Sequence, residues 1–73
     1  MNILIADDHA IVREGVKQIL RGLPEVKTID EASDGNEAFT KICNNEYDIV
    51  ILDISMPGMS GLDVLQRMRD RDI

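Results

Sequence analysis

Two short apolar runs that each end in aspartate limit the folds open to this chain of 73 residues. Asp7 and Asp8 follow the run Ile3–Ala6, and Asp53 follows the run Ile49–Leu52. Continuous apolar runs of this length are typical of strands buried on both faces, as in parallel sheets covered by crossover helices. If the two strands are parallel neighbours, their acidic ends meet at one edge of the sheet.

Helical and strand patterns alternate along the chain. Apolar residues recur at helical spacing from Val12 to Leu23, with Asp8 as the expected cap, and charged residues such as Arg13 and Lys17 are assigned to the solvent face. Right-handed crossovers would turn the resulting β-α-β-α-β-α order into a parallel sheet with helices on its faces. The predicted elements are a strand at Asn2–Ala6, a helix with apolar positions over Val12–Leu23, an edge strand at Val26–Ala32, a helix at Asn36–Asn44, a strand at Asp48–Asp53, and a helix that starts at a Ser60–Asp63 capping box and continues to Ile73.

Size, charge and cysteine usage narrow the class of protein. A chain of 73 residues forms at most one domain. It contains no run of roughly 18 apolar residues and no basic leader, so we expect a cytoplasmic protein without membrane contact. The net charge of −6 argues against nucleic-acid binding by this segment. Cys43 stands alone, which excludes an internal disulfide, and we expect it in the core.

Three carboxylates at one sheet edge require a counter-charge. Two carboxylates about 5 Å apart repel by roughly 3 kcal/mol at an effective dielectric of about 20. Hard oxygen ligands without paired thiols favour Mg²⁺ or Mn²⁺. Beside such a metal, an aspartate such as Asp53 can act as a nucleophile and form an aspartyl phosphate. The pattern therefore favours phosphate chemistry.

Each of these residues also has a structural interpretation. One of Asp7 and Asp8 could cap the helix while the other is a solvated loop acid, which is the more common role of an isolated Asp-Asp pair, and Asp53 could simply end its strand. His9, in the first turn of a helix, is more often solvated than bound to a metal. The convergence of two strand ends favours the functional interpretation of the three aspartates.

Several spaced motifs together resemble the receiver domains of two-component response regulators. The motifs are Asp7-Asp8-His9, Val12–Gly15, Ala32–Gly35, Asp53 with Met56-Pro57, and Gly61-Leu62. The first of them resembles most closely the NarL/FixJ (LuxR-type) branch. The resemblance implies an α/β, flavodoxin-like fold and a signalling domain, not an enzyme.

The resemblance also implies roles for individual residues. Asp53 would be the phosphoacceptor, Asp8 a direct Mg²⁺ ligand, Asp7 a second ligand often acting through water, and Ser55 a ligand through its backbone carbonyl. The phosphoryl group would come from a sensor histidine kinase.

Receivers of this family have five βα units in the order 2-1-3-4-5, and this chain contains three. Residues 1–73 would then be a partial receiver domain. The later Thr or Ser and the Lys that contact the phosphoryl group in the family, and the helix-turn-helix output domain that binds DNA, would belong to the full-length parent. The third strand would have an unpaired apolar edge, so we expect a homo-oligomer formed through that strand.

Three other functions stay open at this point. The chain could be a self-associating module with a vestigial acidic pocket and no phosphotransfer. A haloacid-dehalogenase-type phosphatase also uses a strand-end aspartate, but it would need a second acid where this chain has Ser55. A dinucleotide-binding half-domain would need a glycine-rich loop in place of Asp7-Asp8-His9.

Overall fold

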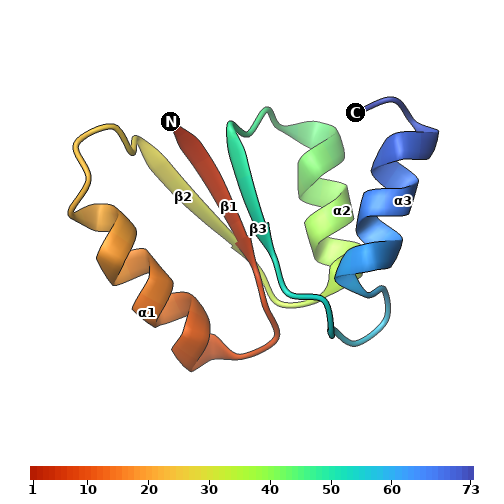
Figure 1. Ribbon diagram of the computed structural model, residues 1–73, viewed down its shortest axis with the longest axis horizontal. Helices are drawn as coiled ribbons and strands as arrows, with labels where there is room; N and C mark the ends of the chain where they lie inside the picture. The colour runs from red at the N-terminus through yellow and green to blue at the C-terminus, as the bar shows by residue number, and fades with distance from the viewer.

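Three parallel strands form a sheet in the order β2-β1-β3, with α1 on one face and α2 and α3 on the other (Figure 1). The computed structural model describes residues 1–73. The predicted order of elements is confirmed, and so is the edge position of the second strand. The elements are β1 (Asn2–Ala6), α1 (Ala10–Arg21), β2 (Thr28–Ala32), α2 (Gly35–Asn44), β3 (Ile49–Leu52) and α3 (Gly61–Asp70).

Strand β1 is the centre of the molecule. Residues 3–6 are each at most 1% exposed because β1 has a strand on either side and helices over the sheet. Full burial of one such aliphatic side chain stabilises the fold by about 1.5–3 kcal/mol. The main core lies between the sheet and the pair α2 and α3, and it consists of Leu4, Ala6, Ala32, Ala38, Ile42, Met56, Met59 and Val64.

Strand β3 is buried on one face, not on both. Ile49 and Ile51 are 41% and 38% exposed, whereas Val50 and Leu52 pack against the core. The prediction of burial on both faces is therefore wrong for this chain. The reason is that β3 forms an edge of the sheet, and the helix on that face, α1, is joined by its ion pairs to β2 at the opposite edge.

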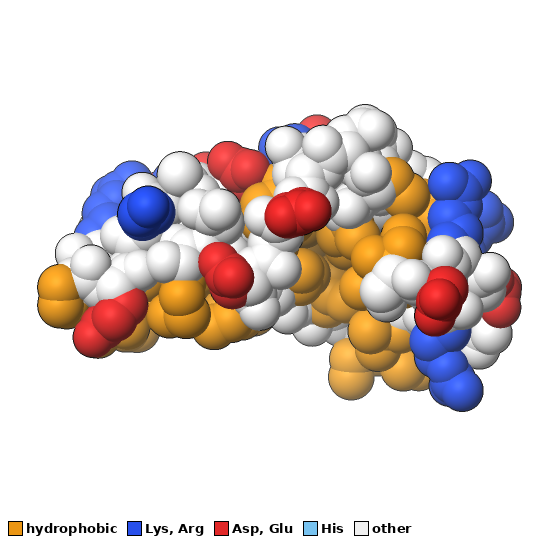
Figure 2. Space-filling model, turned by 90° about the horizontal axis from the view of Figure 1, so that it is seen from above, with side chains coloured by type: hydrophobic (Ala, Val, Ile, Leu, Met, Phe, Trp, Pro, Cys, Tyr) orange, Lys and Arg blue, Asp and Glu red, His pale blue; other side chains and the backbone are white.

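Helix α1 turns part of its charged surface toward the sheet. Arg13 and Lys17 have side chains 16% and 15% exposed, and both pair with Glu31 of β2. Ile11 and Ile19 are 89% and 73% exposed, and α1 has no buried residue. The assignment of Arg13 and Lys17 to the solvent face is wrong because Glu31 attracts them to the sheet. Figure 2 shows hydrophobic side chains open to solvent at the α1 end and in the middle of the molecule.

Three details at the helices differ from the sequence predictions. His9, not Asp8, is the N-cap residue of α1, because the Asp7 carboxylate accepts the His9 amide proton at 2.8 Å and turns the chain there. Helix α3 begins with the predicted Ser60–Asp63 capping box but ends at Asp70, since Asp72 adopts a left-handed φ of 58°. Cys43 is exposed on α2 and not part of the core.

None of the three helices has the length and apolar character needed to cross a lipid bilayer.

Candidate functional site

The loops after β1 and β3 bring four side chains together at the carboxyl edge of the sheet. Ala6 and Leu52 are partners in the parallel register of β1 and β3. The residues that follow them therefore leave the sheet side by side at its carboxyl edge. The Asp53 amide also donates to the Ala6 carbonyl at 2.9 Å. One ligand atom from each of Asp7, Asp8, His9 and Asp53 lies within 4.8 Å of the others. The predicted convergence of the three aspartates is confirmed.

Asp7 is the most firmly held of the three aspartates. Its amide donates to the Ala32 carbonyl of β2 at 3.0 Å, and its Oδ1 accepts from the amide and Nδ1 of His9 at 2.8 Å each. Burial acts to raise the pKa of Asp7, but the hydrogen bonds from His9 and the charges of His9 and Arg13 outweigh it and hold that pKa below its usual value. Asp7 is therefore ready to bind a cation in its charged form.

His9 is solvated, as the sequence favoured, with a side chain that is 66% exposed, and its ring also contacts two of the aspartates. Its Nδ1 lies 2.8 Å from Asp7 Oδ1 and 3.0 Å from Asp8 Oδ1. The hydrogen bond with Asp7 raises the pKa of His9, the charges of Asp8 and Asp7 add to this effect, desolvation opposes it, and the charge of Asp53 contributes least. The ring is accessible to solvent, and when it is protonated it supplies a counter-charge to the acids.

The loop after β3 is fixed by close backbone contacts. A Cβ on Gly61 would lie 2.3 Å from the Asp53 carbonyl oxygen, so this position requires glycine for the helix α3 to start so near the aspartate. A Cβ on Gly35 would lie 1.6 Å from the Met59 carbonyl oxygen. The Ser55 amide donates to Asp53 Oδ1 at 3.3 Å, and the metal-binding role of the Ser55 carbonyl stays a prediction. The backbone of Asp53 is therefore in close contact with the start of α3, and the loop at Met59 with the start of α2.

The three carboxylates of the group fit a divalent cation. Three carboxylates provide hard oxygen ligands from Asp7, Asp8 and Asp53, and their ligand atoms lie close enough to share one ion. Asp7 and Asp53 are half-buried and Asp8 is exposed, so water and a phosphate-bearing ligand can reach the remaining coordination positions. This donor set agrees with the Mg²⁺ or Mn²⁺ expected from the sequence.

Residues 3–73 match the family model of the response regulator receiver domain. The chain belongs to this family. The receiver is 37% identical over 71 residues to the nitrate/nitrite response regulator protein NarL of Escherichia coli K12, and 48% identical over 63 residues to the oxygen regulatory protein NreC of Staphylococcus carnosus. These alignments cover 97% and 85% of the chain but 33% and 29% of the relatives, so the chain spans about a third of their length. The predicted NarL/FixJ branch is confirmed.

Solved structures give the same fold. The signal receiver domain of NarL from Mycobacterium tuberculosis has a TM-score of 0.92 and 35% identity over 99% of this chain and 58% of its own. TrrA from Thermotoga maritima, solved in complex with Mg²⁺-BeF, has a TM-score of 0.86 and 43% identity over 96% of this chain and 59% of its own. The flavodoxin-like receiver fold is confirmed, and the phosphatase and dinucleotide-binding alternatives lose their basis.

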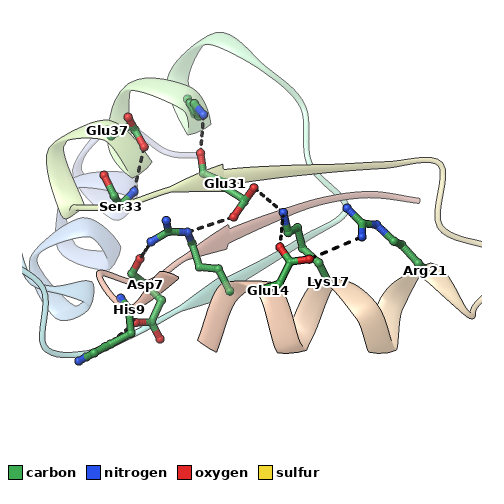
Figure 3. A network of polar contacts seen from close by, with 10 residues as sticks. Asp7, His9, Glu14, Lys17, Arg21, Glu31, Ser33 and Glu37 are labelled. Carbon is green, nitrogen blue, oxygen red and sulfur yellow. Dashed lines mark hydrogen bonds and ion pairs between the residues drawn. The ribbon is translucent and has the colours of Figure 1, made fainter. Parts of the chain in front are cut away.

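Arg13 and Glu31 adjoin the site, and the sequence interpretation missed them. Figure 3 labels Glu31 and Asp7, which lie at the two ends of this contact. The Arg13 guanidinium donates to the Asp7 carbonyl and, through Nε, to Glu31 Oε1 at 3.0 Å. Two signals pointed to this contact: Glu31 is an acid within a strand, and Arg13 and Lys17 lie one helical turn apart. The contact was missed because Arg13 and Lys17, as charged residues, were assigned to the solvent face of the helix.

Proposed function

We propose that this receiver accepts a phosphoryl group on Asp53 from the phosphohistidine of a sensor histidine kinase. The observation that carries the proposal is the convergence of Asp7, Asp8 and Asp53 at one sheet edge. An Asp53 oxygen attacks phosphorus, the P–N bond to the kinase histidine breaks, and an aspartyl phosphate forms. The chain's family membership and its likeness to TrrA, which was solved with Mg²⁺-BeF, support this assignment.

A divalent cation completes the proposed site. Asp7, Asp8, Asp53 and the Ser55 backbone carbonyl would hold Mg²⁺, or Mn²⁺ in its place. The ion supplies positive charge that offsets the repulsion between the incoming phosphoryl oxygens and the Asp53 carboxylate. Asp7 and Asp8 fix the place of the cation, and the half-buried Asp53 stays accessible to the donor.

Transfer to Asp53 is tested with Mg²⁺ and a small acyl phosphate as donor. Mass spectrometry should find one added phosphoryl group, located on Asp53, and the Asp53→Asn variant should stay unmodified. An adduct that persists in Asp53→Asn would refute the assignment. The same assay on a longer chain that contains the later Thr or Ser and Lys measures what those residues add to the rate.

We also propose that residues 1–73 act within a longer, cytoplasmic response regulator. The relatives NarL and NreC are about three times the length of this chain. In such a protein, phosphorylation of the receiver would control a separate C-terminal domain that binds DNA. The net charge of −6 makes contact between this segment and DNA unfavourable.

The exposed edge of β3 favours a second property, self-association of the 73-residue chain. Ile49 and Ile51 present apolar surface beside backbone groups that have no strand partner on that side. Joining the β3 edges of two copies would pair these groups and bury both isoleucines. Light scattering over a dilution series should show a concentration-dependent dimer, and a folded monomer at all micromolar concentrations would contradict it.

A further inference from the structure

Arg13 connects strand β2 to the loop that carries Asp7 and Asp8. Its Nε donates to Glu31 Oε1 at 3.0 Å, and its Nη1 donates to the backbone carbonyl of Asp7. The Arg13 side chain is 16% exposed, and both contacts are partly shielded from water. Lys17 holds the other Glu31 oxygen at 2.9 Å, which fixes the carboxylate to which Arg13 is bound.

The shape of the guanidinium group makes this bridge possible. Its N–H groups diverge in one plane, so Nε and Nη1 can serve two acceptors at once. Hydrogen bonds from a charged donor are stronger than those between neutral groups. A lysine at position 13 would keep the charge but lack the planar fork that serves both acceptors.

The carbonyl that accepts from Arg13 Nη1 is the backbone carbonyl of Asp7, between the two acidic residues of the loop. It belongs to the planar peptide unit that joins Asp7 to Asp8, so a hydrogen bond to it restricts the orientation of that unit. The Asp7 amide is already held by the Ala32 carbonyl at 3.0 Å. Ala32 therefore holds the amide of Asp7 and Arg13 holds its carbonyl. These two hydrogen bonds determine the direction in which the chain continues to Asp8.

We propose that Arg13 is a positioning residue for the acidic site. By bridging Glu31 and the Asp7 carbonyl, it holds Asp7 and Asp8 in the arrangement that meets Asp53. Arg13 acts through these two residues and takes no part in binding the phosphoryl group. The inference rests on the proposed binding of Mg²⁺ at this site and identifies what prepares the site for it. A site whose ligands are already held in place binds an ion more tightly, because less conformational freedom is lost when the ion binds.

The experiment compares Arg13→Met with Arg21→Met. Methionine keeps much of the apolar stem, and both variants remove one positive charge from α1. Arg21 is 60% exposed and lies 3.8 Å from Glu14, so it is a matched control that does not reach Asp7. Two quantities are measured by NMR on each protein: the carbonyl ¹³C shift of Asp7 without metal, and the Kd of Mg²⁺ from a titration of the Asp53 amide shift.

In Arg13→Met we expect the Asp7 carbonyl signal to move upfield and the Kd of Mg²⁺ to rise about tenfold. In Arg21→Met we expect an unchanged carbonyl signal and a change in Kd of less than about twofold. Arg13→Lys should fall between Arg13→Met and the unaltered chain in both quantities. A thermal melt of each variant shows that the titrations are made on folded protein. A purely structural role would lower the Tm and leave the Kd at low temperature unchanged.

Each outcome decides a different claim. An unchanged Asp7 carbonyl signal in Arg13→Met overturns the bridge. A shifted signal with the same Kd as Arg21→Met overturns the positioning role. If the unaltered chain shows the Asp7 signal of a hydrogen-bonded carbonyl but binds no Mg²⁺, the proposed function fails and the positioning role fails with it, while the contact itself stands.

Discussion

The two faces of the sheet are held by different forces. On the face of α2 and α3, Leu4, Ala38 and Val64 are fully buried in an apolar core. On the face of α1, Ile3 and Ile5 of β1 are buried but no residue of the helix itself is, and Arg13 and Lys17 of the helix form ion pairs with Glu31. The first face holds the main apolar core, and the second is joined through Arg13 to the Asp7 end of the site. Apolar truncations and charge changes should therefore act on different properties of the receiver.

The largest expected contrast is between two apolar truncations. Leu4→Ala opens a cavity beneath α2 and α3, and we expect the free energy of unfolding to fall by about 3 kcal/mol. Ile19→Ala removes a side chain that is 73% exposed on α1, and we expect a change within about 0.5 kcal/mol. Urea unfolding followed by circular dichroism measures both. Equal losses would mean that α1 is packed as tightly as the opposite face.

The glycines give a second contrast. In Gly61→Ala the new Cβ would press on the Asp53 carbonyl, so we expect a loss of about 1–3 kcal/mol together with weaker Mg²⁺ binding. In Gly15→Ala the Cβ on α1 meets no atom within 4 Å, and we expect a gain of about 0.5–1 kcal/mol from helix propensity. Thermal melts and Mg²⁺ titrations of both variants test the pair. A harmless Gly61→Ala would contradict the tight contact at the start of α3.

The ionisation of Tyr47 should make the stability of the apolar face fall at alkaline pH. Burial and a 2.6 Å hydrogen bond to Asp30 raise the pKa of Tyr47 from 10.0 to about 12. Because the pKa is higher in the folded protein, the stability it contributes is complete below pH 10 and is lost as the pH rises through about 12. Tyr47 is the single tyrosine of the chain, so tyrosinate absorbance reports it directly. A midpoint near 10 in the folded protein would refute the buried hydrogen bond.

The protonation of Glu31 should make the contacts of α1 less stable at acidic pH, because its pKa is lowered on folding whereas that of Tyr47 is raised. The hydrogen bond from Lys17 lowers the pKa of Glu31, burial opposes it, and Arg13 adds to the lowering. The stability contributed is therefore present above the unfolded pKa of about 4.5 and is lost as the pH falls through the lower folded value. Denaturation measured over this acidic range should show a smaller loss in Glu31→Gln than in the unaltered chain. An identical acid profile would show that the pairs do not hold α1.

Sequence alone predicted the parts of the molecule that depend on local pattern. Apolar runs, helical spacing and the Ser60–Asp63 capping box located the elements, and parallel pairing of β1 with β3 was enough to bring Asp7 and Asp53 together. These inferences succeed because parallel strands present the same ends at one edge.

The wrong predictions concern which face of a helix or strand is turned toward the core and what covers it. Apolar spacing in α1 cannot reveal that Glu31 draws Arg13 and Lys17 toward β2, because this is a contact between segments far apart in sequence. The four apolar residues of β3 look buried on both faces, but burial depends on what covers Ile49 and Ile51. The contact between His9 and the two aspartates was missed for a different reason: it is local in sequence, but the apolar pattern does not specify which way the His9 ring turns.

Whether Asp7, Asp8 and Asp53 share one Mg²⁺ ion can be measured by isothermal titration of the unaltered chain and of the variants Asp7→Asn, Asp8→Asn and Asp53→Asn. We expect one bound ion per chain and at least about tenfold weaker binding in each variant, because each removes a charged ligand from the same ion. Binding that is absent from the unaltered chain, or that survives all three substitutions unchanged, would contradict it.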